Sequence, residues 1–351
     1  MLPTVTGILT AAEVSATLDS IAGEQLPSGL IPWARGVHGD AWNHTEAIMA
    51  LALGGRHRET ERAYQWLLDA QRPDGSWHQY YLGDSVEDSK LDANTCAYPA
   101  AGVWHQWLLT RDRGFIETMW PMVERAIDFV LDLQTPRGEI RWARHVDGTA
   151  WPFALLTGSS SISHSLRCAI ALAEELGHER PDWELSVASL VRTIHHVPEA
   201  FQPKERWAMD WYYPVLVGVL RCEEARQRLD DEWDRFVMPG LGVRCVSDRP
   251  WVTAAETCEC ALALLAAEQP DRARQLFGWA QRLRTDDGSY LTGDVHPQGV
   301  SYPDGERSTY TAAAVVLAAD ALSRTSPASG LFVDHDLLPA VVDFEAELDL
   351  D

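Results

Sequence analysis

The chain has 351 residues, a formal net charge of −23 at pH 7 and 46% hydrophobic residues. A chain of this length and composition can bury a large core, either as one big domain or as two small ones. The negative charge disfavours nucleic acids and anionic membranes as partners, because both require basic patches. No long uncharged apolar run predicts a membrane span, and residues 1–20 lack the basic and apolar regions of a secretion signal.

Cysteine and tryptophan usage adds two expectations. The six cysteines lie mostly in apolar helical runs, which favours free thiols in a reducing cytoplasm over a disulfide framework. The fifteen tryptophans exceed the usual share, and such rings either pack in a core or stack on a ligand. We therefore expect an intracellular globular protein with an aromatic core or an aromatic pocket.

Helical patterns fill the chain, and the connections between them are alternately long and short. The predicted helices cover, in chain order, residues 11–23, 40–53, 57–71, 92–109, 113–134, 159–176, 181–194, a stretch that opens at 210, then 223–236, 253–267, 271–284 and 306–323. The even-numbered helices are apolar on nearly all sides, which is typical of buried helices, and the odd-numbered ones are amphipathic. No segment is rich in strand signals. The pattern predicts an all-α (α/α)6 barrel of twelve helices, with every long loop on one face.

A weak internal repeat supports a ring of similar units. Residues 62–77 (RAYQWLLDAQRPDGSW) are echoed at 125–140 and more weakly at 273–290. Such repeats indicate stacked units that cannot bury their faces alone. We expect one barrel domain over residues 1–325, followed at 326–351 by a loosely ordered acidic extension that ends in EAELDLD.

The segment 62–77 resembles the QW repeat of squalene–hopene cyclases and protein prenyltransferase β-subunits. In those families the repeat ties outer helices to loops and carries no chemistry, so the resemblance implies a helical toroid. The catalytic motifs of those families are not matched, because LDANT at 91–95 lacks the paired acids of Asp-x-Asp-Asp-Thr. Cys258 and Cys260 point about 200° apart on a helix, so no metal site is expected.

A longer resemblance is to glucoamylase-type glycoside hydrolases. Residues 38–82 and 90–133 resemble the first helix pairs of that family, and residues 293–320 resemble its last loop and inner helix. The resemblance implies hydrolysis of a glycoside. Two departures stand out, because Ala143 occupies the position of the family's general acid and Asp294 lies near the position of its general base.

Carboxylates at the starts of the inner helices are the candidates for catalysis, since inverting hydrolysis needs two of them about 6.5–9.5 Å apart. We predict water activation by Asp294 or Glu306 and proton donation by Glu256 or Asp210. Each acid could instead cap a helix. Substrate contacts are predicted for acids, rings and basic side chains near the same loops, namely Asp40, Trp42, His44, Asp92, Trp142, His164, Trp207, Tyr212, Trp251 and Arg249.

The sequence thus predicts a carbohydrate-active enzyme without a cofactor that acts on a small glycoside or a sugar conjugate. A sugar-containing substrate is favoured over a prenyl diphosphate, and neither a nucleic acid nor a membrane is an expected partner. Lyase or isomerase chemistry also fits displaced carboxylates. The alternatives are an isoprenoid enzyme, with aromatic rings that stabilise carbocations, and an inactive ring that binds a sugar. The sequence gives no indication of the oligomeric state.

Overall fold

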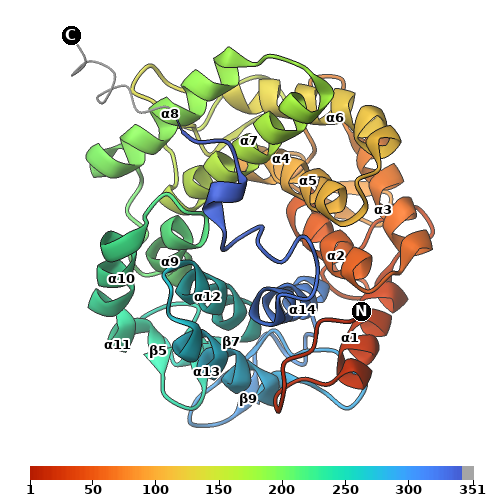
Figure 1. The fold of residues 1–351 in the computed structure, drawn as a ribbon, viewed down its shortest axis with the longest axis vertical. Coiled ribbons are helices and arrows are strands. Elements are labelled where there is room, and N and C mark those ends of the chain that lie inside the picture. Colours follow the sequence, from red (N-terminus) through yellow and green to blue (C-terminus); the bar gives the residue numbers. More distant parts are fainter. Residues whose placement is uncertain (342–351) are drawn as a thin grey trace.

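Two concentric rings of helices form the molecule in this computed structural model, which describes residues 1–341. Each inner helix packs on the next, and the last of them packs back on the first, which closes the ring (Figure 1). The closed ring confirms the predicted all-α (α/α)6 barrel. The inner helices are α2 (Ala41–Leu53), α5 (Pro99–Thr110) with the short α4 (Ala93–Ala97) before it, α7 (Leu156–Leu176), α9 (Ala208–Leu216), α12 (Ala254–Ala266) and α14 (Thr309–Ser323).

The outer helices cover the inner ring and run back to its other end (Figure 1). They are amphipathic, because one face packs on the inner helices and the other meets solvent. They are α1 (Ala11–Glu24), α3 (His57–Ala70), α6 (Arg113–Leu131), α8 (Pro181–His196), α10 (Cys222–Asp231) with the short α11 (Trp233–Phe236), and α13 (Pro270–Ala280). Short 3-10 turns follow at η1 (Pro198–Ala200), η2 (Gln281–Leu283) and η3 (His335–Leu337).

The long loops contain short strands, which the sequence did not predict. β1 and β2 form a small hairpin, β3 pairs antiparallel with the distant β4, and β5 to β9 form one antiparallel five-stranded sheet. None of the strands within the described chain exceeds four residues. Such strands are too short to show the alternation of apolar and polar residues by which a strand is predicted. The strands are β1 (Tyr80–Leu82), β2 (Ser85–Asp88), β3 (Leu91–Asp92), β4 (Ala143–Arg144), β5 (Val237–Met238), β6 (Gly242–Arg244), β7 (Trp251–Thr253), β8 (Gly293–Val295) and β9 (Val300–Ser301).

The loops after the outer helices repeat one construction, which explains the internal repeat. Gln71 Nε2 donates to the carbonyls of Gly75, in its own loop, and of Met122, in the next outer helix, at 3.0 and 2.8 Å. Gln134 makes the same two kinds of bond one unit later, and Gln25 makes them one unit earlier. The Gln25 copy was missed in the sequence because the residues around it differ. In each copy one amide fastens a loop to the neighbouring unit.

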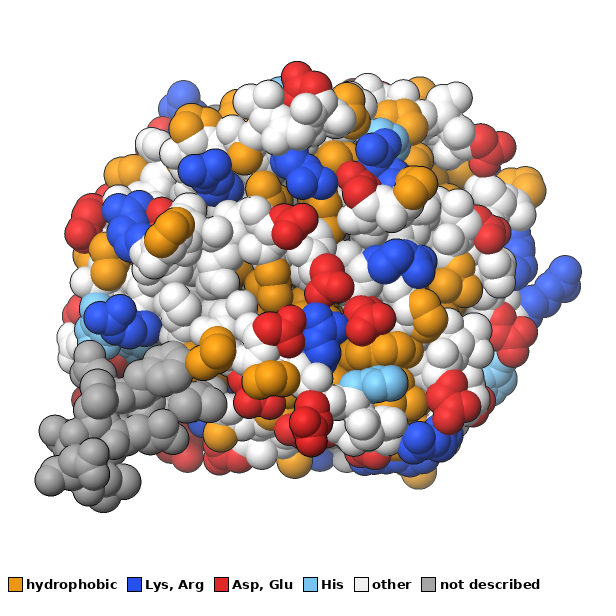
Figure 2. Space-filling model, turned by 90° about the horizontal axis from the view of Figure 1, so that it is seen from above, with side chains coloured by type: hydrophobic (Ala, Val, Ile, Leu, Met, Phe, Trp, Pro, Cys, Tyr) orange, Lys and Arg blue, Asp and Glu red, His pale blue; other side chains and the backbone are white. Residues whose placement is uncertain are grey.

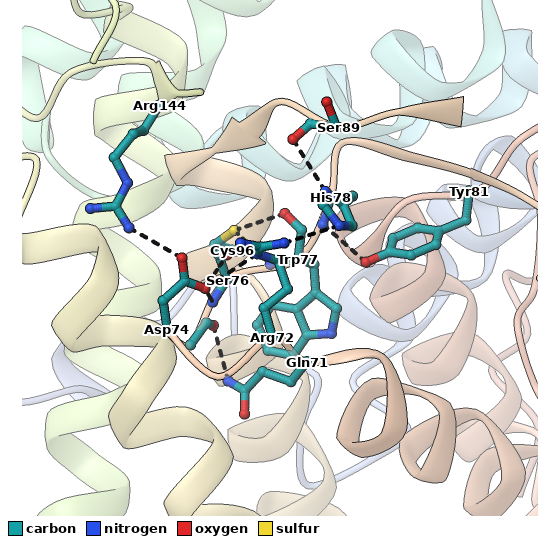
Figure 3. A network of polar contacts seen from close by, with 11 residues as sticks. Gln71, Arg72, Asp74, Ser76, Trp77, His78, Tyr81, Ser89, Cys96 and Arg144 are labelled. Atoms are coloured by element: carbon teal, nitrogen blue, oxygen red, sulfur yellow. Dashed lines mark hydrogen bonds and ion pairs between the residues drawn. The ribbon is translucent and has the colours of Figure 1, made fainter. Parts of the chain in front are cut away.

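A polar network holds the loop after α3 against its neighbours (Figure 3). Asp74 accepts a hydrogen bond from Ser76 Oγ at 2.6 Å and pairs with Arg144 of β4 at 3.3 Å. The backbone N–H of His78 donates to the hydroxyl of Tyr81 at 2.9 Å. The network thereby fixes the β1–β2 hairpin on the face where the long loops gather.

The segment 326–341 runs across the ring at the C-terminal ends of the inner helices (Figure 1). Phe332 of this segment is buried, and Arg167 of α7 donates to three of its backbone carbonyls at 2.6, 3.0 and 3.3 Å. The first part of the predicted extension is therefore packed into the ring and closes one end of it. The rest of that extension, residues 342–351, lies outside the described residues.

The surface of the molecule carries many charged side chains, as the composition of the chain predicts. At the edge of the ring shown in Figure 2, acidic and basic side chains are interspersed, and hydrophobic side chains are scattered among them. All six cysteines are free thiols, and five of them are buried. Within residues 1–341 we find no helix with the length and hydrophobicity needed to cross a membrane.

The repeated loop predicts a strict requirement for glycine at position 75. Its φ is +88°, and an added Cβ would lie 2.0 Å from the carbonyl oxygen of Arg125. Gly83 also has a positive φ, +60°, but nothing lies within 4 Å of its Cβ position. Both alanine variants incur the left-handed backbone cost of about 1–2 kcal/mol, and Gly75→Ala adds about 1–3 kcal/mol of steric displacement.

We therefore expect Gly75→Ala to reduce the free energy of unfolding in urea by clearly more than Gly83→Ala does. Equal losses from the two variants would contradict the repeated loop contact.

Candidate active site

A cavity of about 410 Å³ opens among the long loops, above the N-terminal ends of the inner helices. This is the face on which the sequence predicted a pocket. Its lining is rich in acids and in aromatic rings, which together bind sugars through hydroxyl groups and ring faces. The acids are Asp40, Glu46, Asp92, Asp210, Glu256 and Glu259, and the rings are those of Trp33, Trp42, Tyr80, Trp142, Trp207 and Tyr310.

Asp40 precedes α2 and serves both as its cap and as part of the cavity wall. One carboxylate oxygen accepts from the backbone N–H of Asn43 at 2.8 Å. The other accepts from the Asn43 side chain at 2.7 Å and from Trp33 Nε1 at 2.6 Å. Burial raises the pKa of Asp40, and these hydrogen bonds oppose the rise. The sequence left open whether Asp40 caps the helix or contacts the substrate, and in the structure it caps α2 and also lines the cavity.

Asp92 stands at the start of α4, next to Asp40 in the ring because α2 packs on α4 and α5. It accepts a hydrogen bond from the backbone N–H of Thr95 at 3.1 Å. Burial raises the pKa of Asp92 to about 6, although the Thr95 bond and the charge of Lys90 oppose the rise. The Lys90 ammonium lies 4.4 Å from the centre of the Trp142 ring. This wall therefore combines an acid near its titration point with an aromatic face.

Asp210 and Glu256 reach the cavity from α9 and α12. Asp210 accepts hydrogen bonds from the hydroxyl and the backbone N–H of Thr157, at the start of α7. Burial raises the pKa of Asp210, and the Thr157 bonds oppose it. Glu256 lies in the first turn of α12, half-buried, and accepts a hydrogen bond from the hydroxyl of Thr253. Since α12 is across the ring from α5, Glu256 faces the wall that carries Asp92.

Two further acids, Glu46 and Glu259, form the floor of the cavity and were missed in the sequence. Glu46 accepts from Trp42 Nε1 at 3.1 Å and from the Tyr98 hydroxyl at 3.2 Å. Glu259 accepts from the hydroxyl of Tyr212. Burial raises the pKa of both glutamates, and the charge of Asp40 adds to the rise for Glu46 as the charge of Glu46 does for Glu259. An acid inside an otherwise apolar inner helix was the signal that could have revealed them, because acids are seldom fully buried.

Three predicted contact residues are buried away from the cavity lining. His44 lies on α2 but turns outward, where its ring nitrogens bond the backbone of Ile31 and Ala63 at 3.0 Å each. His164 bonds the carbonyl of Leu331 at 3.0 Å, at the closed end of the ring. Tyr212 lies behind the cavity, where it supports the floor. The one-turn spacing that placed His44 beside Asp40 did not indicate which neighbour it faces.

Asp294, predicted as a general base, is held outside the cavity lining. Arg282 donates to both of its carboxylate oxygens at 2.5 and 2.6 Å, and His296 Nε2 lies 3.1 Å away. Burial alone would raise the pKa of Asp294, but the hydrogen bonds and charge of Arg282, together with His296, outweigh it and lower that pKa. A paired carboxylate of low pKa is a weak base. The predicted role of Asp294 therefore does not fit the structure.

The other predictions for the last loops also differ from the structure. Glu306 accepts a hydrogen bond from the Thr292 hydroxyl at 2.9 Å and is not part of the cavity lining. Trp251 of β7 donates to the carbonyl of Tyr302 at 3.0 Å, and Arg249 is exposed in the preceding turn. All of them belong to the rim around the five-stranded sheet, whose pairing the sequence did not predict.

The chain is 52% identical over 336 residues to the MMP endo-(1,4)-3-O-methyl-α-D-mannosidase of Mycolicibacterium hassiacum, which covers 96% of this chain and 93% of that protein. The chain belongs to the family of that mannosidase. No protein family profile matches it. The family membership supports the predicted glycoside-hydrolase-like enzyme with a sugar-containing substrate and does not support the isoprenoid alternative.

Solved structures confirm the fold at low sequence identity. A wild-type glycosidase matches with a TM-score of 0.71 and 12% identity over 92% of this chain and 100% of that chain. A D-mannose isomerase matches with a TM-score of 0.64 and 11% identity over 88% and 97%. A cellobiose 2-epimerase from Spirochaeta thermophila matches with a TM-score of 0.63 and 12% identity over 90% and 96%. At such low identities these similarities show only that the proteins share the fold.

The raised pKa of Asp92 predicts a pH-dependent stability. The folded pKa is about 6, above the ordinary value of about 4. The resulting stabilisation is complete below about pH 4 and is lost as the pH rises through about 6. Asp92→Asn stays neutral at every pH. Its free energy of unfolding, relative to that of the unchanged protein, should therefore increase by roughly 3 kcal/mol between about pH 4 and 7.

Urea unfolding of both proteins across this pH range measures the shift. Asp69→Asn removes the same charge from the exposed face of α3 and is the control. A difference between Asp92→Asn and the unchanged protein that stays constant with pH would refute the assignment.

Proposed function

We propose that the chain hydrolyses internal α-(1→4) bonds in chains of 3-O-methyl-mannose units. The observation that carries this proposal is the identity to the mannosidase, 52% over almost the full length of both proteins. The cavity supports it, because it offers several carboxylates within a frame of aromatic rings. Glycoside hydrolysis requires one carboxyl that donates a proton and one carboxylate that activates water or attacks the sugar.

Glu256 is the proposed general base. It lies in the first turn of α12, where the positive end of the helix dipole favours a negative charge. The Thr253 hydroxyl bonds one of its oxygens and so orients the carboxylate. It is half-buried, whereas the floor acid Glu46 is buried. An oriented carboxylate at this depth can accept a proton from a water molecule that attacks the sugar.

The proposed general acid is one of two carboxyls on the facing wall, Asp40 or Asp92. Burial raises the pKa of both, so either can keep a proton at a pH where an ordinary carboxyl has lost it. Asp40 is framed by the rings of Trp33 and Trp42, where a sugar ring would stack. Asp92 accepts a hydrogen bond from the backbone N–H of Thr95 in α4, and the side chain of Trp142 also favours its charged form.

The proposed reaction uses both sides of the cavity. The protonated aspartic acid donates its proton to the glycosidic oxygen as the bond from that oxygen to the anomeric carbon breaks. Water attacks the anomeric carbon from the opposite side and transfers a proton to Glu256. The products are a shortened glycan and a new reducing end of inverted configuration. Asp210, held by Thr157, is assigned to sugar binding.

Variants of the proposed base and acids should respond differently to the leaving group. Glu256→Gln should lower kcat about 10²–10⁴-fold on a 3-O-methyl-mannose oligosaccharide and also on the matching α-glycosyl fluoride. The acid variant, Asp40→Asn or Asp92→Asn, should lose activity on the oligosaccharide but retain most of it on the fluoride. Fluoride leaves without protonation, so the variant that the fluoride rescues identifies the acid.

Steady-state kinetics with both substrates measure these effects, and Asp69→Asn on the exposed face of α3 controls for the loss of one charge. Full activity of Glu256→Gln would eliminate it as the base. Unchanged oligosaccharide hydrolysis by both aspartate variants would eliminate the proposed acid.

A further inference from the structure

The aliphatic side chains of the cavity are confined to one sector of its wall. They are Leu155, at the start of α7, Met209, in the first turn of α9, and Ala255, in the first turn of α12. These three helices are consecutive in the ring, since α9 packs on both α7 and α12. Three consecutive helix starts thus place these aliphatic groups in one sector of the wall, which also contains the acids Asp210 of α9 and Glu256 of α12.

The cavity lining also contains, among the described residues, two buried side-chain acceptors without a partner. Gln79 precedes β1 and Asn94 lies in α4, and both line the cavity. Their side-chain oxygens are the unpartnered buried polar atoms within residues 1–341 that belong to the cavity lining. A buried acceptor without a donor is costly, so such groups normally find one. The hydroxyl group of a bound sugar would supply it.

A 3-O-methylated mannose unit presents both kinds of group to such a cavity. Its free hydroxyls are hydrogen-bond donors, whereas its methyl ether has no donor and adds an apolar methyl group. We propose that the patch formed by Leu155, Met209 and Ala255 receives the 3-O-methyl group of the substrate, while Gln79 and Asn94 accept hydrogen bonds from its hydroxyls. The inference rests on the proposed function and makes the patch the determinant of methyl specificity.

Met209 is the central member of this patch. It is half-buried, and its unbranched thioether adapts to the shape of a small apolar group. Leu155 is also half-buried and occupies the N-cap position of α7 without a side-chain capping bond. One methyl group in an apolar pocket typically changes kcat/KM about 10–200-fold. We therefore expect the enzyme to prefer methylated over unmethylated chains by at least about tenfold.

The test compares α-(1→4)-linked mannose oligosaccharides of equal length with and without 3-O-methyl groups. Met209→Gln should lower kcat/KM for the methylated chain about tenfold and bring the ratio of the two substrates towards one. Asn94→Leu removes a hydroxyl acceptor, so it should lower kcat/KM for both chains equally and keep the ratio. Met238→Gln makes the same chemical change at a half-buried residue of β5 outside the cavity lining and should alter neither value.

Leu155→Asn provides an independent variant should Met209→Gln fail to fold. Asparagine is a favoured N-cap residue, so this change is compatible with α7 while it makes the patch polar. It should also bring the substrate ratio towards one. A ratio near one in the unchanged enzyme, or an unaltered ratio in both patch variants, would overturn this inference and leave the proposed function standing. An enzyme that hydrolyses neither chain would overturn both.

Discussion

The common direction of the inner helices is the constraint on which the site depends. Once the ring closes, the N-terminal ends of all inner helices meet on one face, together with their unpaired N–H groups and the positive ends of their dipoles. Acids gather where these charges compensate them, and Asp40 and Asp92 accept N–H bonds from α2 and α4 while they line the cavity. These N–H bonds offset part of the cost of burying carboxylates in a chain that is already strongly acidic.

Burial then differentiates the carboxylates. Glu256 is half-buried, Asp40 and Asp92 are buried in the wall, and Glu46 is buried in the floor, where it accepts bonds from Trp42 and Tyr98. Desolvation disfavours the charged form, so the deeper groups retain protons at higher pH. Hydrolysis of a glycoside needs one protonated and one ionised carboxyl at the same pH. Differences in depth within one cavity can supply both states without a metal or a cofactor.

The ring itself does not select a reaction, since a glycosidase, an isomerase and an epimerase all share it. The loops that surround the cavity are built differently from the helical ring. Their short strands pair segments that are distant in the chain, as β7 and β8 do, and the amides at Gln25, Gln71 and Gln134 fasten each loop to the next unit. The shared ring therefore leaves the choice of reaction to the side chains that line each cavity.

The sequence alone determined the ring, because the apolar inner helices, the amphipathic outer helices and the alternating loop lengths are local patterns with a fixed period. It also indicated Asp40, Asp92, Asp210 and Glu256, since each marks a helix start. The tertiary structure decided which side chains meet. Arg282 holds Asp294 outside the cavity lining, His44 turns outward, and Glu46 lies in the floor instead. The positions of these side chains depend on contacts between elements. The spacing of residues along one helix does not specify which neighbouring element each side chain will face.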